Sequence, residues 1–334
     1  MRNFFKFNLT GKKLLPIWII YMVLFLIPYI FLQFKIQTFS HQPAISEAGA
    51  AMQKFSSILQ LYGFMFLLII VQYAILFYVI KLSIDGIEYN EKISSFVGKF
   101  GKFLMILIPG FLLTIITLGI YGPWLYTRVI KFFASNSFND SNNLEFKGKG
   151  SDLFVIILLT LIIPMLILIF AIVIIAFISG VKNGANPSDA KASPYAFLMM
   201  LLIFILFIPY MYYLYKWIIN FRFKNYDIVL VTGFWNFTGI VALQILLSII
   251  TMGIYAPVAS LKIYKFFAES TFATSETANK RFGYNIEPTK DFLFIWGQSL
   301  LSLITLGIYF PWAFCKITSR ILEKSFTEEI EIAQ

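Results

Sequence analysis

The sequence has very few of the residues from which most catalytic and metal sites are built. Its 334 residues include one cysteine, Cys315, and one histidine, His41. A single cysteine excludes an intramolecular disulfide and a cysteine-based metal cluster. A lone histidine in a short connection is more often simply exposed than catalytic. Because the sequence also has no phosphate-binding glycine loop and no nucleophile motif, we expect no enzyme, no cofactor and no metal site.

Charged residues are also scarce, at 13%, whereas 59% of residues are hydrophobic. A soluble domain is about a quarter charged, so this composition indicates a protein embedded in a membrane. Acidic residues are absent from the long apolar runs, which argues against a classical proton-coupled carrier. Four apolar runs have the length of a membrane span, at 14–34, 58–80, 153–179 and 195–215. Three further apolar runs lie at 103–121, 239–255 and 292–309.

One apolar phrase, broken by glycine and proline, occurs three times. It reads TLGIYGPW at 117–124, TMGIYAPV at 251–258 and TLGIYFPW at 305–312. Aligned without gaps over 113–138, 247–272 and 301–326, the copies are identical in eight columns. Chance similarity among apolar segments does not explain fixed polar and proline columns. The pattern therefore predicts an internal repeat.

Each copy has the features of a helical hairpin. An apolar helix leads to a glycine, and a proline follows where the first turn of a second helix tolerates it. The second segment carries a cation five residues after the proline. The predicted turn residues are Gly119, Pro123, Gly253, Pro257, Gly307 and Pro311.

The distribution of lysine and arginine favours one of two topologies. Of the 27 cations, 21 lie outside the three second helices. With an internal amino terminus, seven crossings place 13 of them inside and 8 outside. If each second helix crosses back, ten crossings place 17 inside and 4 outside. The tendency of cations to stay in the cytoplasm favours ten crossings, and it also explains the net charge of +10 without nucleic acid.

Two interpretations of the repeated cations remain open. A cation within a membrane normally faces a cavity, a partner or a lipid headgroup. The side chains could extend to the headgroup layer from helices that lie at the surface. Alternatively, they line a shared polar cavity for an anionic small molecule or a lipid phosphate. The candidate residues are Arg128, Lys262, Lys316, Thr117, Thr251, Thr305, Tyr121, Tyr255 and Tyr309.

The TLGIY-x-PW phrase, its following cation and three phenylalanine- and glycine-containing lead-ins resemble the YjgN-like family of bacterial inner-membrane proteins. The lead-ins are FNLTGKKLL at 7–15, FVGKFGKFL at 96–104 and FKGKGSDLF at 146–154. The middle copy departs from the phrase, with Met252 for leucine and Val258 for tryptophan. The resemblance implies a multi-pass protein of the bacterial inner membrane, but no reaction.

Together these patterns predict an all-α polytopic protein of about 7–10 transmembrane helices. It would form one membrane domain over 1–334, with its amino terminus in the cytoplasm. Its parts would be helix pairs at 14–80 and 153–219 and repeat units at 96–138, 233–272 and 291–326. The leading functional prediction is transport, or lipid or anion handling, at a polar cavity near the turns. The alternative is a non-catalytic scaffold or accessory subunit with a protein partner.

Overall fold

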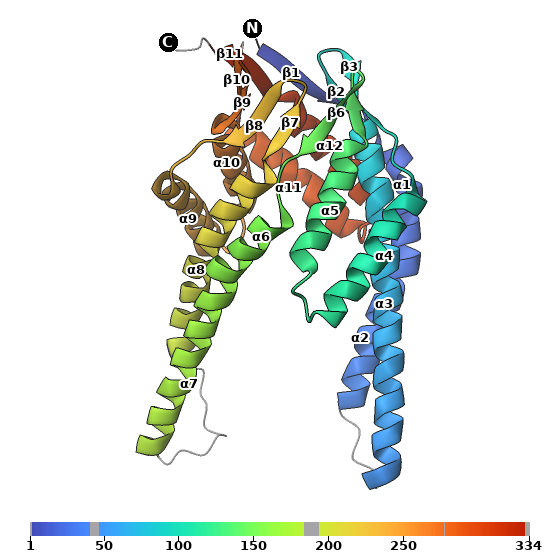
Figure 1. Ribbon diagram of the computed structural model, residues 1–334, viewed down its shortest axis with the longest axis vertical. Helices are drawn as coiled ribbons and strands as arrows, with labels where there is room; N and C mark the ends of the chain where they lie inside the picture. Colours follow the sequence, from blue (N-terminus) through green and yellow to red (C-terminus); the bar gives the residue numbers. More distant parts are fainter. Residues whose placement is uncertain (1, 41–46, 184–193, 277, 331–334) are drawn as a thin grey trace. The chain divides into compact units, whose positions relative to one another are not determined.

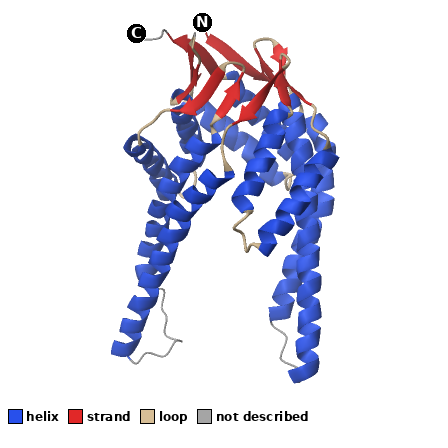
Figure 2. Ribbon diagram, viewed as in Figure 1, coloured by secondary structure: helices blue, strands red, loops and turns tan. Residues whose placement is uncertain are grey.

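The computed structural model describes the backbone of residues 2–40, 47–183, 194–276 and 278–330 (Figure 1). Along these ranges, helices and short strands alternate (Figure 2). The predicted loop histidine, His41, lies outside the described residues.

The described residues contain eleven strands in an antiparallel sheet, in the order β3-β2-β1-β11-β10-β9-β8-β7-β6-β5-β4. The prediction of an all-α protein is therefore wrong. The three lead-in segments of the sequence analysis each start with the last residue of a strand, namely Phe7, Phe96 and Phe146. The strands are β1 (Arg2–Phe7), β2 (Ile87–Tyr89), β3 (Lys92–Ile93), β4 (Ser95–Phe96), β5 (Ser137–Asn139), β6 (Asn142–Phe146), β7 (Phe221–Phe223), β8 (Tyr226–Leu230), β9 (Thr271–Thr274), β10 (Asn279–Tyr284) and β11 (Ser325–Ile330).

The strand sequences are rich in aromatic and β-branched residues, which fit a half-buried pleated surface. In β1, exposed and more buried residues alternate, as the two-residue period of a strand requires. Two of the connections are tight turns with positive φ at both central residues, at Asn90–Glu91 and at Asp140–Ser141. This conformation matches the twist of antiparallel strands.

Helices leave the sheet as five excursions, each flanked by two strands. The two long excursions are α1 (Gly11–Tyr21), η1 (Met22–Leu26), α2 (Ile27–Ser40) and α3 (Glu47–Asp85), then α6 (Gly150–Ile157), η2 (Leu158–Ile162), α7 (Ile163–Asn183) and α8 (Pro194–Ile218). The three short ones are hairpin 1, α4 (Phe100–Ile116) and α5 (Gly122–Ser135); hairpin 2, α9 (Phe234–Ile250) and α10 (Ala256–Glu269); and hairpin 3, α11 (Pro288–Ile304) and α12 (Phe310–Glu323).

One backbone hydrogen bond closes the base of every excursion. The amide that follows the first strand donates to the carbonyl that precedes the second strand. The five bonds are Asn8 to Gly86 (2.7 Å), Val97 to Asn136 (3.0 Å), Lys147 to Asn220 (2.9 Å), Val231 to Ser270 (2.8 Å) and Asn285 to Lys324 (2.9 Å). Each excursion therefore starts and ends at the same place on the sheet.

Three helical segments of the described part are long and apolar enough to cross a membrane: Gly11–Phe34, Gly63–Asp85 and Gly150–Ala171. They lie in the long excursions and correspond to three of the four longest predicted runs. In the fourth run, the side chains of 195–205 lie outside the described residues. The helices α5, α10 and α12 have 14 residues each, about 21 Å, against a hydrocarbon core of about 30 Å. The prediction of about 7–10 transmembrane helices is wrong, because three segments of the described part are long and apolar enough to be spans.

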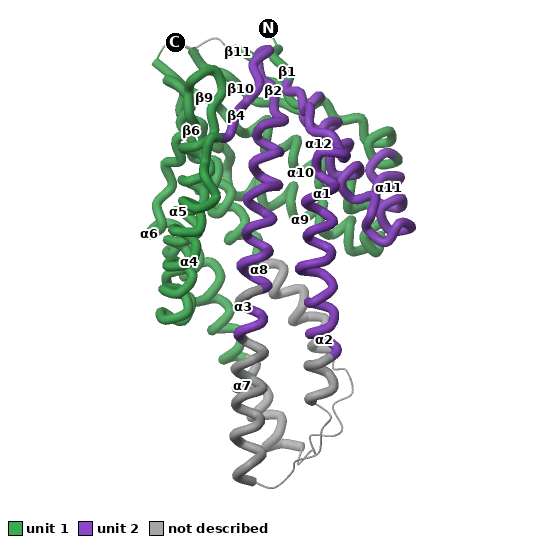
Figure 3. Tube along the Cα trace, turned by 90° about the vertical axis from the view of Figure 1, so that its right-hand side faces the viewer, with its two compact units in different colours: residues 1–4, 97–293, 324–334 green, residues 5–96, 294–323 purple. Residues whose placement is uncertain are grey.

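The chain divides into two compact units, residues 1–4, 97–293 and 324–334, and residues 5–96 and 294–323 (Figure 3). The first contains one apolar cluster around Phe237 and another around Trp217. The second contains a cluster of Phe7, Leu9, Leu14 and Cys315. The predicted single membrane domain stays a prediction.

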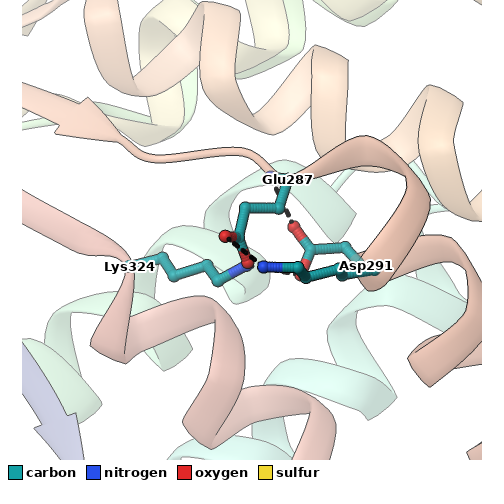
Figure 4. Close-up of polar contacts among 4 residues, drawn as sticks. Glu287, Asp291 and Lys324 are labelled. Carbon is teal, nitrogen blue, oxygen red and sulfur yellow. Dashed lines mark hydrogen bonds and ion pairs between the residues drawn. The ribbon is translucent and has the colours of Figure 1, made fainter.

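The fourth residue of the first helix is buried in all five excursions. Four of these residues are apolar, namely Leu14, Phe103, Leu153 and Phe237. The fifth is Asp291, which is 1% exposed. Its carboxylate accepts a hydrogen bond from Lys324 Nζ at 2.6 Å and one from the Glu287 amide at 2.9 Å (Figure 4). The structure therefore makes Asp291 half of a buried ion pair.

Candidate functional site

The three copies of the TLGIY phrase form the same turn at the tips of the three short hairpins. In each tip, the glycine has a positive φ, +93° at Gly119 and +85° at Gly253 and Gly307. Its amide donates to a carbonyl five residues earlier, at 2.7 Å in every case. This is the left-handed helix ending that glycine favours. The predicted turn residues therefore do lie at turns, and the predicted prolines fall in the first turn of α5, α10 and α12.

The threonine that is identical in all three copies forms hydrogen bonds within the turn. The hydroxyl of Thr117 donates to the Leu113 carbonyl at 2.7 Å and accepts the Tyr121 amide at 3.0 Å. Thr251 and Thr305 make the same pair of bonds. The hydroxyls of these three threonines, which are predicted to line a cavity, join the end of one helix to the start of the next.

The tips present large apolar side chains that protein does not cover. The residue before the glycine is 94% exposed at Leu118 and Met252 and 84% exposed at Leu306. Isoleucines on either side of it are also exposed, including Ile116, Ile120, Ile250, Ile254, Ile304 and Ile308. Contiguous exposed apolar patches of this kind mark membrane or protein contact sites.

Each hairpin holds its cation against its own tyrosine. The charged groups of Arg128, Lys262 and Lys316 each lie 5.6 Å from the centre of the ring of Tyr121, Tyr255 or Tyr309, respectively. This distance is typical of a cation–π interaction. The predicted tyrosine and cation of each copy are thus brought together locally. A cavity shared by the three cations stays a prediction.

Two glutamines complete the polar cluster in hairpins 2 and 3. The Tyr255 hydroxyl donates to Gln244 Oε1 at 3.1 Å, and the Tyr309 hydroxyl donates to Gln298 Oε1 at 2.9 Å. In hairpin 3, Lys316 Nζ also donates to the Tyr309 hydroxyl at 2.9 Å. Sequence reasoning missed both glutamines because they lie three residues before the aligned block. A longer alignment would have paired them with each other.

Hairpin 1 differs at two linked positions. Gly110 occupies the place of the glutamines, and Leu125 occupies the place of Ala259 and Ala313. A Cβ atom on Gly110 would lie 2.4 Å from Leu125 Cδ1, so the leucine fills the space that a glutamine needs. The buried Tyr121 hydroxyl consequently has no hydrogen-bond partner among the described residues. Hairpin 1 therefore has the ring and the cation without the amide.

The tryptophan of the phrase seats two hairpins against a glycine at the start of a long excursion. A Cβ on Gly150 would lie 2.7 Å from Trp124, and one on Gly11 would lie 2.6 Å from Trp312. The excursion that follows hairpin 2 is hairpin 3, and its first helix, α11, starts with Pro288 instead of glycine. The copy without the tryptophan, which has Val258, is thus the one whose next excursion starts without a glycine.

These features define a class of membrane protein in which short strands carry long apolar helices, of sufficient length to span a membrane, and shorter hairpins with apolar tips. The chain belongs to the family described as "Bacterial protein of unknown function (DUF898)", whose model matches residues 5–291. Over 68 residues it is 40% identical to the inner membrane protein YjgN of Salmonella typhimurium (strain LT2). That match covers 20% of this chain and 17% of the relative. No solved structure matches the chain. The resemblance to YjgN-like proteins is confirmed.

Proposed function

We propose that the chain is an inner-membrane protein that handles anionic lipids, whose headgroups it binds at the three short hairpins. The observation that carries this proposal is the shared layout of the hairpins, an exposed apolar tip followed at a fixed distance by an exposed cation. An exposed tip of leucine, methionine and isoleucine is favourable in hydrocarbon and unfavourable in water. The relative named an inner membrane protein supports the location.

The lengths of the hairpin helices support insertion into one leaflet. The first helices have 17 residues and the second have 14. At about 1.5 Å per residue they reach roughly 20–25 Å, and they return to the sheet through the closing backbone bond. A tip at mid-bilayer lies about 15 Å below the edge of a hydrocarbon core of about 30 Å.

At that depth, the cations come within reach of headgroups. Each cation is seven residues after the tyrosine that ends the turn, which places it about 10 Å from the tip along the helix axis. It then lies about 5 Å inside the hydrocarbon edge, a distance that a lysine or arginine side chain can cover. The ring beneath it and, in hairpin 3, the tyrosine hydroxyl hold the charged end in place. A phosphate is the ligand that this layer offers to a cation.

The test is native mass spectrometry of the purified full chain with added phosphatidylglycerol or phosphatidylethanolamine. We expect tighter binding of phosphatidylglycerol to the unmodified protein. In the triple variant R128Q/K262Q/K316Q, affinity should fall about fivefold per hairpin, because one cation near an anionic headgroup contributes about 1 kcal/mol.

A matched control removes the same charge elsewhere. The variant K92Q/K224Q/K290Q also lowers the net charge from +10 to +7, but at exposed positions in strand β3, in the β7–β8 turn and at the start of α11. Its lipid binding should match that of the unmodified protein. Equal loss in both variants, or no loss in the hairpin variant, would contradict the proposal.

A further inference from the structure

The polar groups at the tyrosines of hairpins 2 and 3 leave a nitrogen donor without a partner. The lysine ammonium has only donors, so the Tyr309 hydroxyl accepts from Lys316 and uses its own hydrogen toward Gln298. This arrangement fixes the amide with Oε1 toward the tyrosine and Nε2 away from it. Among the described residues, Nε2 has no hydrogen-bond partner in Gln244 or in Gln298.

Gln244 is only 6% exposed, but Nε2 of neither glutamine is among the buried side-chain atoms that lack a partner in the described part of the chain, so each nitrogen is open to the surface. An amide nitrogen has two hydrogens to donate. The hydrogen bond from the tyrosine hydroxyl involves only Oε1 of each glutamine and leaves Nε2 without a partner among the described residues. An acceptor from outside the protein would satisfy the remaining hydrogens.

One hydroxyl links the two donors of hairpin 3. Lys316 Nζ donates to the Tyr309 hydroxyl, and this hydroxyl donates to Gln298 Oε1, at 2.9 Å each, so that Nε2 of the same amide is the second donor of the cluster. A group with two or more anionic oxygens can accept from the amide and from the ammonium at once. Phosphate has this chemistry, and a charged hydrogen bond to it is stronger than a neutral one.

We infer that hairpins 2 and 3 are tight phosphate sites, in which the glutamine Nε2 and the lysine Nζ bind one phosphate group, and that hairpin 1, which lacks the amide, holds a headgroup more weakly through its cation alone. The inference rests on the proposed function, and it identifies the ligand group and two of the three hairpins. Hairpin 1 has Gly110 where hairpins 2 and 3 have glutamine, and Leu125 where they have alanine. The leucine side chain fills the space of the amide, which supports the difference between hairpin 1 and the other two hairpins.

The test counts the phosphatidylglycerol molecules that remain bound in native mass spectra and measures their affinities. The unmodified protein should retain two tightly bound lipids. In Q244M/Q298M, which keeps the side-chain length, the affinity of both should fall about tenfold. Grafting the pair into the first hairpin, as G110Q/L125A, should add a third tightly bound lipid.

A second variant separates binding from a purely structural role of the glutamines. In Q244M/Q298M/Y255F/Y309F, the hydroxyls that the amides satisfy are also removed, so no polar group is left unpaired. Weak lipid binding in this folded quadruple variant supports the inference. Binding equal to that of the unmodified protein would overturn it.

Competition distinguishes the source of the phosphate. If millimolar glycerol 3-phosphate displaces the two lipids from the unmodified protein, the sites accept a soluble phosphate, and if it does not, they take the lipid. Either result supports the inference, provided that it depends on Gln244 and Gln298. Lipid binding that depends on the hairpin cations but not on the glutamines would overturn this inference and leave the proposed function intact. Binding that depends on neither would overturn both.

Discussion

At the scale of single residues, Asp291 is the clearest departure from the common pattern. Four of the five excursions place leucine or phenylalanine at this buried position, and the fifth places an aspartate that Lys324 neutralises. A buried ion pair rarely contributes more to protein stability than a pair of apolar side chains in its place. The loss of one partner, however, removes the compensation for a buried charge. Asp291 and Lys324 therefore depend on each other.

We expect D291N to destabilise the protein by about 3 kcal/mol, because Lys324 then loses its buried counter-charge and keeps only the half-exposed Glu287, whose carboxylate lies 2.9 Å from Nζ. The double variant D291L/K324S places at both positions the residue types found in other excursions, leucine as in Leu14 and serine as in Ser270. It should recover most of the lost stability. Thermal unfolding in mild detergent measures both variants, and a double variant as unstable as D291N would show that the pair is not the cause.

At the scale of the elements, the strands β6, β7 and β8 are linked by charge as well as by backbone bonds. Asp227 accepts from Arg222 Nε at 2.8 Å and also from Lys147 Nζ. The hydrogen bonds from Arg222 and Lys147 lower the pKa of the Asp227 carboxyl from 3.8 to about 2. Glu145 lies opposite Arg222 on the next strand, so that charges alternate across the sheet.

This lowered pKa predicts a pH dependence of stability. The contribution of Asp227 is fully present above the pKa of the unfolded chain, near 3.8, and is lost as the pH falls toward about 2. In D227N, the unfolding temperature should therefore change less between pH 4 and pH 2 than in the unmodified protein. The effect is limited by solvent, since the carboxylate is 38% exposed. Identical slopes for the two proteins would show that the cluster does not contribute.

At the scale of the whole molecule, the closing backbone bonds predict the sidedness of the connections between excursions. Each excursion ends where it started, so Asn143, Asn225 and Glu276, which are exposed and separated by two excursions, should lie on one side of the membrane. In a C315S background, single cysteines at these positions should react with an impermeant maleimide from the same side. Labelling of Asn225 and Glu276 from opposite sides would contradict this topology.

The tips provide the matching control. A cysteine in place of Leu118 or Met252 should be protected from the impermeant reagent on both sides, because the tip lies in hydrocarbon. Reaction at these positions from the side opposite Glu276 would indicate that the hairpins cross, which helices of 14 residues are too short to do.

The sequence predicted local features well and distant ones poorly. The glycine, proline and tyrosine of each phrase are adjacent in the chain, so their spacing predicted the turns. The strands have two to six residues, and although some pair through tight turns, others pair across excursions of about 40 to 80 residues, where no short window contains both partners. The Asp291–Lys324 pair was missed for the same reason, since the two residues are 33 positions apart in the chain. Gln244 and Gln298 were missed because they lie just before the aligned block of the repeat.

Because the base of each excursion is closed, its helical segment is an insertion between two neighbouring strand ends. The length of such an insertion can change without altering the strands that hold it. The long and short excursions are then two sizes of one insertion. A chain in which hairpin 2 is replaced by a tight turn should therefore keep its remaining strand register.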